Sequence, residues 1–152
     1  MKYQRRRTCV FNLNYHIIFC PKYRKPFLYK IGKSKLLRYF NSSCIKHGAT
    51  LREAEIMPDH VHLFVSVRNQ YMFNLSKFMQ HVKGWSSYCI RKNNYKLKQH
   101  KALWAPSYFC ESIGHISEST IRKYIRDQTT TMKSDYKYKH LVKKLSINPF
   151  RI

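Results

Sequence analysis

Pro58-Asp59-His60-Val61-His62-Leu63-Phe64-Val65 is the clearest strand signal in the chain, because its residues follow the two-residue period of a strand. Valine and phenylalanine also favour strands. The side chains of His60 and His62 therefore project from one face, with their Cα atoms about 6.5–7 Å apart. Two neutral imidazoles at this spacing can share one divalent metal ion if a third ligand comes from elsewhere. The alternative is that both histidines lie on the polar face of a half-buried strand.

The segments on either side predict the order βαββαβ followed by a final helix. The predicted strands are residues 13–20, 50–56, 60–67 and 108–112, and the predicted helices are residues 31–47 or 34–47, 75–92 and 118–133. This order is typical of an α+β fold, in which an antiparallel sheet of the ferredoxin or RNA-recognition type carries its helices on one face. We expect a single domain over residues 1–152, with a core at about 13–133 and a basic tail at 134–152.

The charge of the chain indicates a polyanionic partner. It has 30 Lys and Arg residues against 7 Asp and Glu, a net charge of +23 with histidines neutral. Such an excess opposes compact folding by self-repulsion and favours association with a polyanion. Many of the 12 tyrosines and 9 phenylalanines lie beside basic residues, which suits stacking on unpaired bases of single-stranded or looped nucleic acid. A ribosomal-type or merely basic protein has a similar composition, whereas a small-molecule enzyme is disfavoured.

The remaining composition indicates a cytoplasmic, nucleoid-associated protein with no membrane partner. No apolar run approaches the length of a membrane span, and the start of the chain is too polar for a secretory signal. The five cysteines form no Cys-x-x-Cys pair, which fits a reducing compartment and argues against a zinc ribbon.

The predicted final helix offers the missing part of a metal site. Tyr124 and Gln128 are four residues apart, so they lie on one helical face, about 6 Å apart along the axis. The phenolic oxygen of Tyr124 and the carbonyl oxygen of Gln128 can each act as a third ligand. Each residue alone also fits an ordinary structural role, because a tyrosine usually packs against other side chains and a glutamine on a helix usually faces solvent. Together with His60 and His62 they favour a metal site.

Five motifs in this order resemble those of the single-tyrosine transposases of small bacterial and archaeal insertion sequences, within the HUH (His-hydrophobe-His) endonuclease superfamily. They are Tyr15-His16-Ile17-Ile18-Phe19-Cys20-Pro21-Lys22-Tyr23-Arg24-Lys25-Pro26, Met57-Pro58-Asp59-His60-Val61-His62-Leu63, Lys83-Gly84-Trp85-Ser86-Ser87, Leu103-Trp104-Ala105-Pro106-Ser107-Tyr108-Phe109 and Tyr124-Ile125-Arg126-Asp127-Gln128. A lone His-x-His pair is common in unrelated proteins, whereas five motifs in family order are specific. The resemblance covers about residues 13–128.

The resemblance implies a role for each of five residues. His60 and His62 match the metal-binding pair, Tyr124 matches the nucleophile, and Gln128 matches an additional metal ligand. Gly114 falls in the hinge that joins the sheet to the tyrosine helix, which in this family lets the tyrosine complete the site of the partner subunit. A homodimer with composite active sites is therefore expected.

The implied chemistry is cleavage and rejoining of single-stranded DNA at insertion-sequence ends. A divalent ion, Mg²⁺ or Mn²⁺, would bind and orient the scissile phosphate, and Tyr124 would attack phosphorus to form a 5′-phosphotyrosine. Mg²⁺ prefers oxygen ligands and imidazole suits Mn²⁺ better, so both ions stay open. Two alternatives remain: a noncatalytic or domesticated module that binds single-stranded nucleic acid on the same fold, and a nuclease of the relaxase or replication-initiator type.

The implied substrate is single-stranded DNA with hairpins near the element ends. The candidate contacts are basic or aromatic residues in three segments: Arg5, Arg6, Arg7, Lys22, Tyr23, Arg24, Lys25 and Lys83. Each is equally explicable as part of a solvated basic surface.

Overall fold

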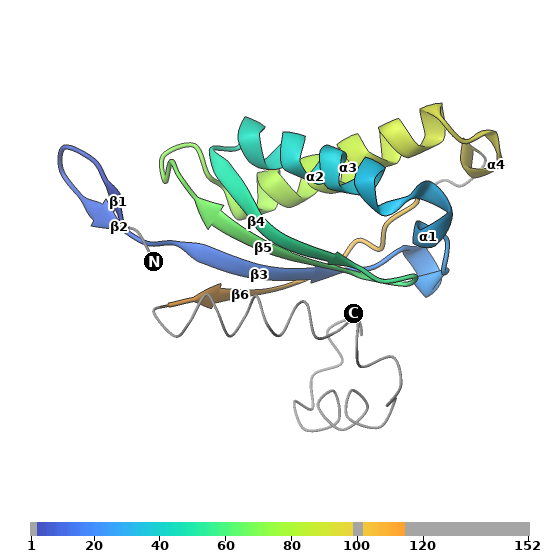
Figure 1. Cartoon of the computed structure of the whole chain (residues 1–152), viewed down its shortest axis with the longest axis horizontal. Helices are drawn as coiled ribbons and strands as arrows, with labels where there is room; N and C mark the ends of the chain where they lie inside the picture. Colours follow the sequence, from blue (N-terminus) through green and yellow to red (C-terminus); the bar gives the residue numbers. More distant parts are fainter. Residues whose placement is uncertain (1–2, 99–101, 115–152) are drawn as a thin grey trace, which may run out of the picture.

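A computed structural model describes residues 3–98 and 102–114, which form a four-stranded antiparallel sheet with two long helices on one face (Figure 1). The sheet has the order β4-β5-β3-β6. Its strands are β3 (Asn14–Phe19), β4 (Ala49–Ile56), β5 (Val61–Val67) and β6 (Phe109–Ile113). This arrangement confirms the predicted α+β fold of the ferredoxin type. The predicted helix at residues 118–133 lies outside the described residues.

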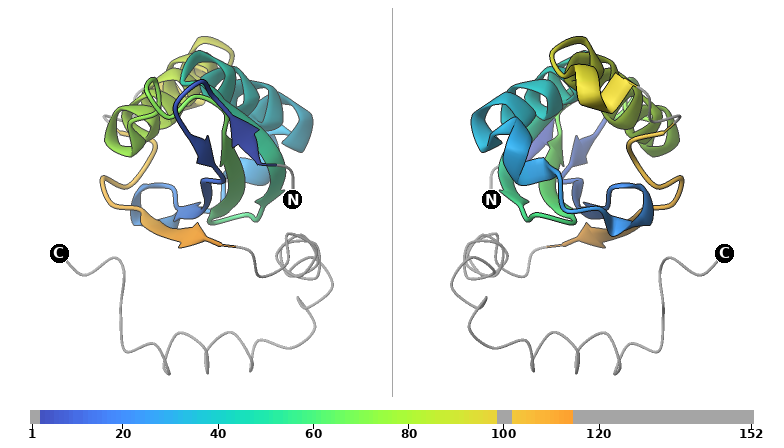
Figure 2. Two further views of the ribbon diagram at one scale, coloured as in Figure 1. Left: turned by 90° about the vertical axis from the view of Figure 1, so that its left-hand side faces the viewer. Right: turned by 90° about the vertical axis from the view of Figure 1, so that its right-hand side faces the viewer.

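The two long helices form one layer above the sheet, as the end-on views of Figure 2 show. They are α2 (Lys33–Lys46) and α3 (Leu75–Lys92). Gly48, with φ +66°, follows α2 in the left-handed conformation that ends many helices. Asn74 caps α3, because its side chain accepts a hydrogen bond of 2.9 Å from the backbone N–H of Lys77.

The main hydrophobic core lies between this helical layer and the sheet. Alternate strand residues such as Ile17 and Leu63 point into it and are fully buried. Phe40 of α2 packs against Phe19 and Trp104, with ring centroids 5.7 Å and 6.2 Å away. The residues between them on the strands face the opposite side of the sheet, where the histidines lie.

Several short elements are additional to the predicted ones. They are the hairpin of β1 (Gln4–Arg5) and β2 (Val10–Phe11), the 3₁₀ turn η1 (Lys22–Arg24), and the single-turn helices α1 (Leu28–Ile31) and α4 (Tyr95–Lys98). Elements of two to four residues are too short to show a helical or strand period in the sequence.

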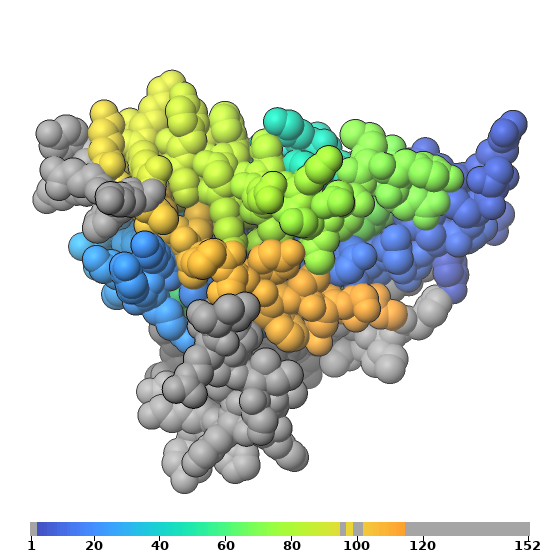
Figure 3. Space-filling view, turned by 180° about the vertical axis from the view of Figure 1, so that it is seen from behind, coloured from blue at the N-terminus to red at the C-terminus, as the bar shows by residue number. Residues whose placement is uncertain are grey.

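The hairpin and the turn η1 lie at opposite ends of the sheet (Figure 1). The hairpin projects from the body of the molecule, as the view from behind shows (Figure 3). The turn η1 follows the end of β3, near the start of β5. Among the described helices, none is long and apolar enough to cross a membrane.

Candidate metal centre

Two neighbouring strands bring a third histidine to the predicted pair. His62 lies on β5, and His60 is the residue directly before this strand. Their ring centroids are 5.0 Å apart, so the two side chains lie together as the strand period predicts. Antiparallel pairing of β3 with β5 sets His16 on the same face, opposite the helical layer. The rings of His16 and His62 stack, with centroids 5.3 Å apart and planes inclined by 16°.

A chain of hydrogen bonds orients His62. Nδ1 of His16 lies 3.0 Å from Oε1 of Glu111 on β6, and Nε2 of His16 lies 3.0 Å from Nδ1 of His62. An ionised carboxylate only accepts, so His16 donates from Nδ1, and a neutral His16 then accepts the proton of His62 Nδ1. This assignment leaves the lone pair of His62 on Nε2, a buried atom with no hydrogen-bond partner among the described residues. Nε2 is therefore the atom that a metal ion would use.

Asp59 orients His60 in a similar way. His60 Nδ1 donates to Asp59 Oδ1 over 2.7 Å, so the lone pair of the neutral ring lies on Nε2. Asp59 Oδ2 also accepts from Arg24 Nε at 3.0 Å and Nη2 at 2.8 Å. The hydrogen bond from His60, with those from Arg24, holds the pKa of Asp59 well below its usual range. The carboxylate is therefore ionised and can only accept.

Burial keeps His62 neutral. Its side chain is completely inaccessible to solvent. The alternative considered from the sequence, in which His62 lies on the polar face of a half-buried strand, therefore does not describe this residue. Burial is the main cause that lowers the pKa of His62 to about 3, and a positive charge on His60 or His16, when either ring is protonated, lowers it further. A metal ion that binds at neutral pH therefore displaces no proton from this ring.

The acidic residues of this basic chain gather around the histidines. Besides Asp59 and Glu111, strand pairing sets Glu55 of β4 opposite His62. Glu55 is buried and accepts a 3.0 Å ion-pair contact from Lys33 Nζ. Three of the seven acidic residues in the chain thus lie beside one histidine cluster. Their placement lowers the local positive charge where a cation would bind.

The described residues supply two oriented histidines and no complete ligand set. Over residues 3–98 and 102–114, no group of three or more His, Cys, Asp or Glu side chains could hold a metal ion. Tyr124 and Gln128, the predicted nucleophile and third ligand, lie outside the described residues. The two imidazole donors fit one side of a divalent site, and the remaining ligands must come from another part of the chain or from a substrate.

Gly114 follows the end of β6 and is exposed. Its φ is outside the left-handed region, and an added Cβ would meet nothing within 4 Å in the described part of the chain. Neither backbone strain nor crowding therefore requires glycine at this position. The hinge role of Gly114 stays a prediction.

The predicted DNA contacts fall into groups with different surroundings. Arg5, Arg6 and Arg7 are exposed at the hairpin end, where Arg6 Nη2 donates to the carbonyl oxygen of Arg68 over 3.0 Å. The segment Lys22–Lys25 lies at the other end and reaches the metal centre through the ion pair of Arg24 with Asp59. These roles in DNA binding stay predictions.

Lys83 differs from the other basic candidates because its ammonium group lies against backbone. Its Nζ donates to the carbonyl oxygens of Ala105, Pro106 and Ser107 over 2.9, 2.9 and 2.8 Å. The structure thus gives Lys83 a clear role in holding the loop before β6. A direct contact between Lys83 and DNA stays a prediction.

Spacing along the sequence did not reveal a role for His16 or Glu111, and it favoured a turn role for Asp59 over one in orienting a histidine. His16 is 46 residues from His62 and 95 from Glu111, so only strand pairing brings the three side chains together. One signal was present: strand alternation places His16 on the face opposite Ile17. The scarcity of acidic residues was a second signal, because a carboxylate in such a basic chain is a candidate for a specific structural or functional role.

Comparison with known proteins identifies the relatives of the chain. Residues 9–128 match the family described as "Transposase IS200 like". The chain is 31% identical over 125 residues to the ISDra2 transposase TnpA of Deinococcus radiodurans, which covers 80% of this chain and 88% of that protein. It is 28% identical over 120 residues to the transposase for insertion sequence element IS200 of Salmonella typhimurium, with 77% of each chain covered.

Solved structures share the fold. A crystal structure of a candidate transposase from Deinococcus radiodurans superposes with a TM-score of 0.66 at 30% identity, covering 84% of this chain and 98% of that chain. A REP-associated tyrosine transposase bound to a REP hairpin gives a TM-score of 0.60 at 12% identity, covering 90% of this chain and 76% of that one. At that identity the second match supports the fold alone.

Proposed function

Because the chain belongs to the IS200-like transposase family, we propose that it cleaves and rejoins single-stranded DNA at the ends of an insertion sequence. The observation that carries the proposal is the orientation of His60 and His62. Each ring is held through Nδ1 by hydrogen bonds that lead to a carboxylate, and each therefore presents the lone pair of Nε2. A protein that only binds nucleic acid has no need for two imidazoles held in this way.

The proposed centre combines the two histidines with residues of the C-terminal segment. His60, His62 and Gln128 would hold a divalent ion, Mg²⁺ or Mn²⁺. When bound, this ion would neutralise charge on the scissile phosphate and orient it for attack. The histidine donors favour Mn²⁺, whereas the amide and phosphate oxygens also suit Mg²⁺.

Tyr124 is the proposed nucleophile. Its phenolic oxygen forms a bond to phosphorus as the bond from phosphorus to the 3′-oxygen breaks, and the phenolic proton is lost. The products are a 5′-phosphotyrosine and a free 3′-hydroxyl group. Attack by another 3′-hydroxyl on the phosphotyrosine reverses the step and rejoins strands, with the bond energy conserved in the protein–DNA link.

The proposed assembly is a homodimer, in which residues 1–152 of each chain form one domain. Gly114 would act as the hinge that lets the segment with Tyr124 reach the histidines of the partner subunit. The proposed substrate is single-stranded DNA with hairpins near the element ends, and the net charge of +23 supports a nucleic-acid partner. The proposed phosphate contacts are the exposed residues Arg5–Arg7 and the segment Lys22–Lys25, which is exposed except at the half-buried Lys22.

A covalent-adduct assay tests the proposal. The native protein is incubated with Mn²⁺ or Mg²⁺ and end-labelled single strands from both flanks of its own gene, and denaturing gels are searched for a protein–DNA adduct. We expect an adduct that disappears with EDTA, with Tyr124→Phe and with His62→Gln.

Tyr71→Phe is the matched control, because Tyr71 is an exposed tyrosine in the turn before α3 and should keep the adduct. An adduct that survives Tyr124→Phe would contradict the nucleophile. Strand binding without any adduct would instead favour the noncatalytic alternative.

A further inference from the structure

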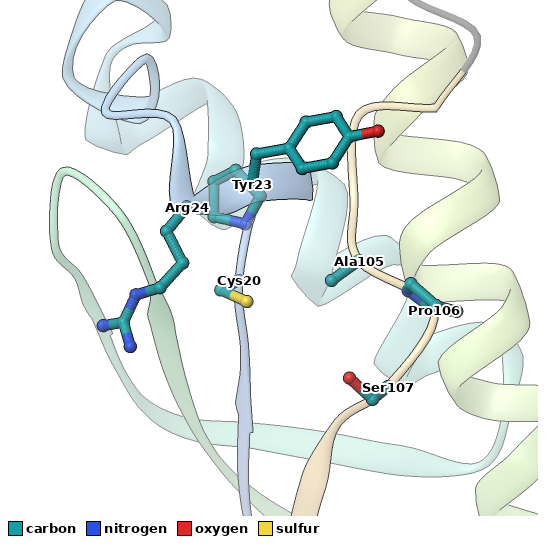
Figure 4. Close-up of a pocket in the computed structure, with 7 residues that line it drawn as sticks. Cys20, Tyr23, Arg24, Ala105, Pro106 and Ser107 are labelled. Carbon is teal, nitrogen blue, oxygen red and sulfur yellow. The ribbon is translucent and has the colours of Figure 1, made fainter. Parts of the chain in front are cut away.

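A cavity of about 570 Å³ lies between the turn η1 and the loop that precedes β6 (Figure 4). It is linked to the metal centre through Arg24, which is among its lining residues and forms an ion pair with Asp59. Its walls include Cys20, Tyr23, Ala105 and Ser107. In Figure 4 the Cys20 thiol and the Ser107 hydroxyl point into the space between the two segments, and the Tyr23 side chain reaches across its upper end. The cavity thus offers an aromatic face together with small polar groups, as ligand sites commonly do.

Backbone hydrogen bonds fix both walls of this cavity. The N–H of Lys22 donates to the carbonyl of Leu103 over 2.8 Å, and the N–H of Ala105 donates to the carbonyl of Cys20 over 2.9 Å. The three bonds from Lys83 Nζ hold the loop from the other side. The cavity is therefore formed before any ligand binds.

The turn that forms one wall is strained. Tyr23 and Arg24 have φ values of +60° and +50°, which side chains other than glycine rarely adopt. The Tyr23 side chain is 78% exposed, so packing within the described chain does little to compensate. Strain of this kind persists only where the surrounding structure imposes it, and it clusters at functional sites. Here it directs consecutive side chains apart: Tyr23 extends across the cavity, and Arg24 points away from it toward Asp59 (Figure 4).

We propose that this cavity binds one unpaired nucleobase of the DNA strand, stacked on Tyr23 next to the scissile phosphate. The proposal rests on the function proposed above. An exposed aromatic ring in a cavity suits a flat base, and nearby cations suit the phosphates on either side of it. Lys22 Nζ lies 5.1 Å from the centroid of the Tyr23 ring, and Lys25 is exposed.

The connection between the cavity and the metal centre implies that the bound base lies close to the reacting bond. Arg24 is the residue after Tyr23, and its guanidinium holds the same carboxylate of Asp59 that orients His60. One turn therefore supplies both the base-stacking ring and a support for a metal ligand. A strand whose base occupies the cavity would pass its backbone beside the histidine pair.

A comparison of two strands tests this inference. Binding of fluorescein-labelled oligo(dT) of about 20 nucleotides is measured by anisotropy beside that of an abasic strand with the same number of phosphates, in EDTA. We expect wild-type protein to prefer oligo(dT). Tyr23→Gly should lower its affinity for oligo(dT) about tenfold, since base stacking has this magnitude, and leave the abasic strand bound as before. Ala105→Leu, which fills the cavity, should do the same.

Tyr71→Ser is the matched control, since Tyr71 is equally exposed but lies in the turn before α3; it should bind both strands as wild type does. Tyr23→Gly removes the left-handed strain, so its urea midpoint should stay or rise, and weaker binding cannot then be ascribed to unfolding. Unchanged oligo(dT) binding by Tyr23→Gly and Ala105→Leu would overturn the inference. Competition by micromolar thymidine monophosphate would also overturn it, in favour of a free-nucleotide site.

The adduct assay separates the two proposals. An adduct with wild-type protein, together with identical binding of oligo(dT) and the abasic strand, would leave the transposase chemistry standing and remove the base site. Preference for oligo(dT) that depends on Tyr23, with no adduct under any metal, would support the base site and remove the chemistry.

Discussion

The two faces of the central sheet use alternate residues of the same strands, but different interactions hold them. On the helical side, Leu63 contributes to an apolar core in which only shape and volume matter. On the other side, His16, His62 and Glu111 are held by hydrogen bonds between specific atoms. The first face supplies the stability of the fold, and the second holds the proposed metal ligands. Substitutions on the two faces should therefore change different measured quantities.

The largest effect on stability is expected from the helical face. Phe40→Ala removes a fully buried ring that packs against Phe19 and Trp104, and should lower the free energy of unfolding by about 3–5 kcal/mol. Urea denaturation measures this loss. The affinity of the folded protein for Mn²⁺, measured by calorimetry, should stay as in wild type. A parallel loss of metal affinity would show that the two faces are coupled.

The next effect is expected from the histidine face. His16→Phe keeps a ring but removes the acceptor for His62 Nδ1–H, so the affinity for Mn²⁺ should fall about 10- to 100-fold, which is about 1.4–2.8 kcal/mol. His16→Gln keeps an acceptor oxygen and should restore part of this affinity. In nitrogen-15 spectra at one pH, wild-type His62 should carry its proton on Nδ1. Equal affinity of His16→Phe and wild type would rule out the orienting role.

A smaller effect is expected at the edge of the helical layer. Asn74→Ala removes the cap of α3 and should lower the free energy of unfolding by about 1 kcal/mol. Asn74→Asp keeps an acceptor for the N–H of Lys77 and should stay close to wild type in urea denaturation. If both variants lose stability equally, the side-chain cap is not the cause.

The smallest effect is expected on the outer surface of the same layer, with the opposite sign. Gly84 lies exposed within α3, and an added Cβ would meet nothing within 4 Å in the described part of the chain. Gly84→Ala should therefore raise the free energy of unfolding by about 0.8–1 kcal/mol, because alanine favours helix. The urea midpoint measures the gain, and a loss would indicate a contact outside the described residues.

The sequence predicted the long elements because their hydrophobic periods are strong. The bounds of α3 agree with the predicted helix, and β5, which contains His62 and directly follows His60, lies within the predicted strand at residues 60–67. The partners of these histidines could not be predicted, because they depend on strand register. His16 meets His62 only when β3 and β5 pair with Tyr15 opposite Val65.

The cavity could not be predicted from the sequence for a different reason. Tyr23 and Arg24 adopt left-handed conformations that local preferences disfavour, so propensity argues against the turn that is present. Its second wall comes from a loop some 80 residues later in the chain, which is pinned by the side chain of Lys83. Local rules fail where distant segments impose a conformation.

The bond between His16 and Glu111 also has a consequence for the order of folding. It joins residues 95 apart, and β6 is the last described strand to leave the ribosome. Contacts of such separation form late, because a long loop must close first. A nascent chain can thus pack its helices on three strands before Glu111 is in place to accept the hydrogen bond from His16, the residue that orients His62. Pulse-labelled hydrogen exchange should find the amides that join β3 to β6 protected after those that join β3 to β5. Synthesis itself would then delay completion of the proposed metal centre until almost the whole sheet exists.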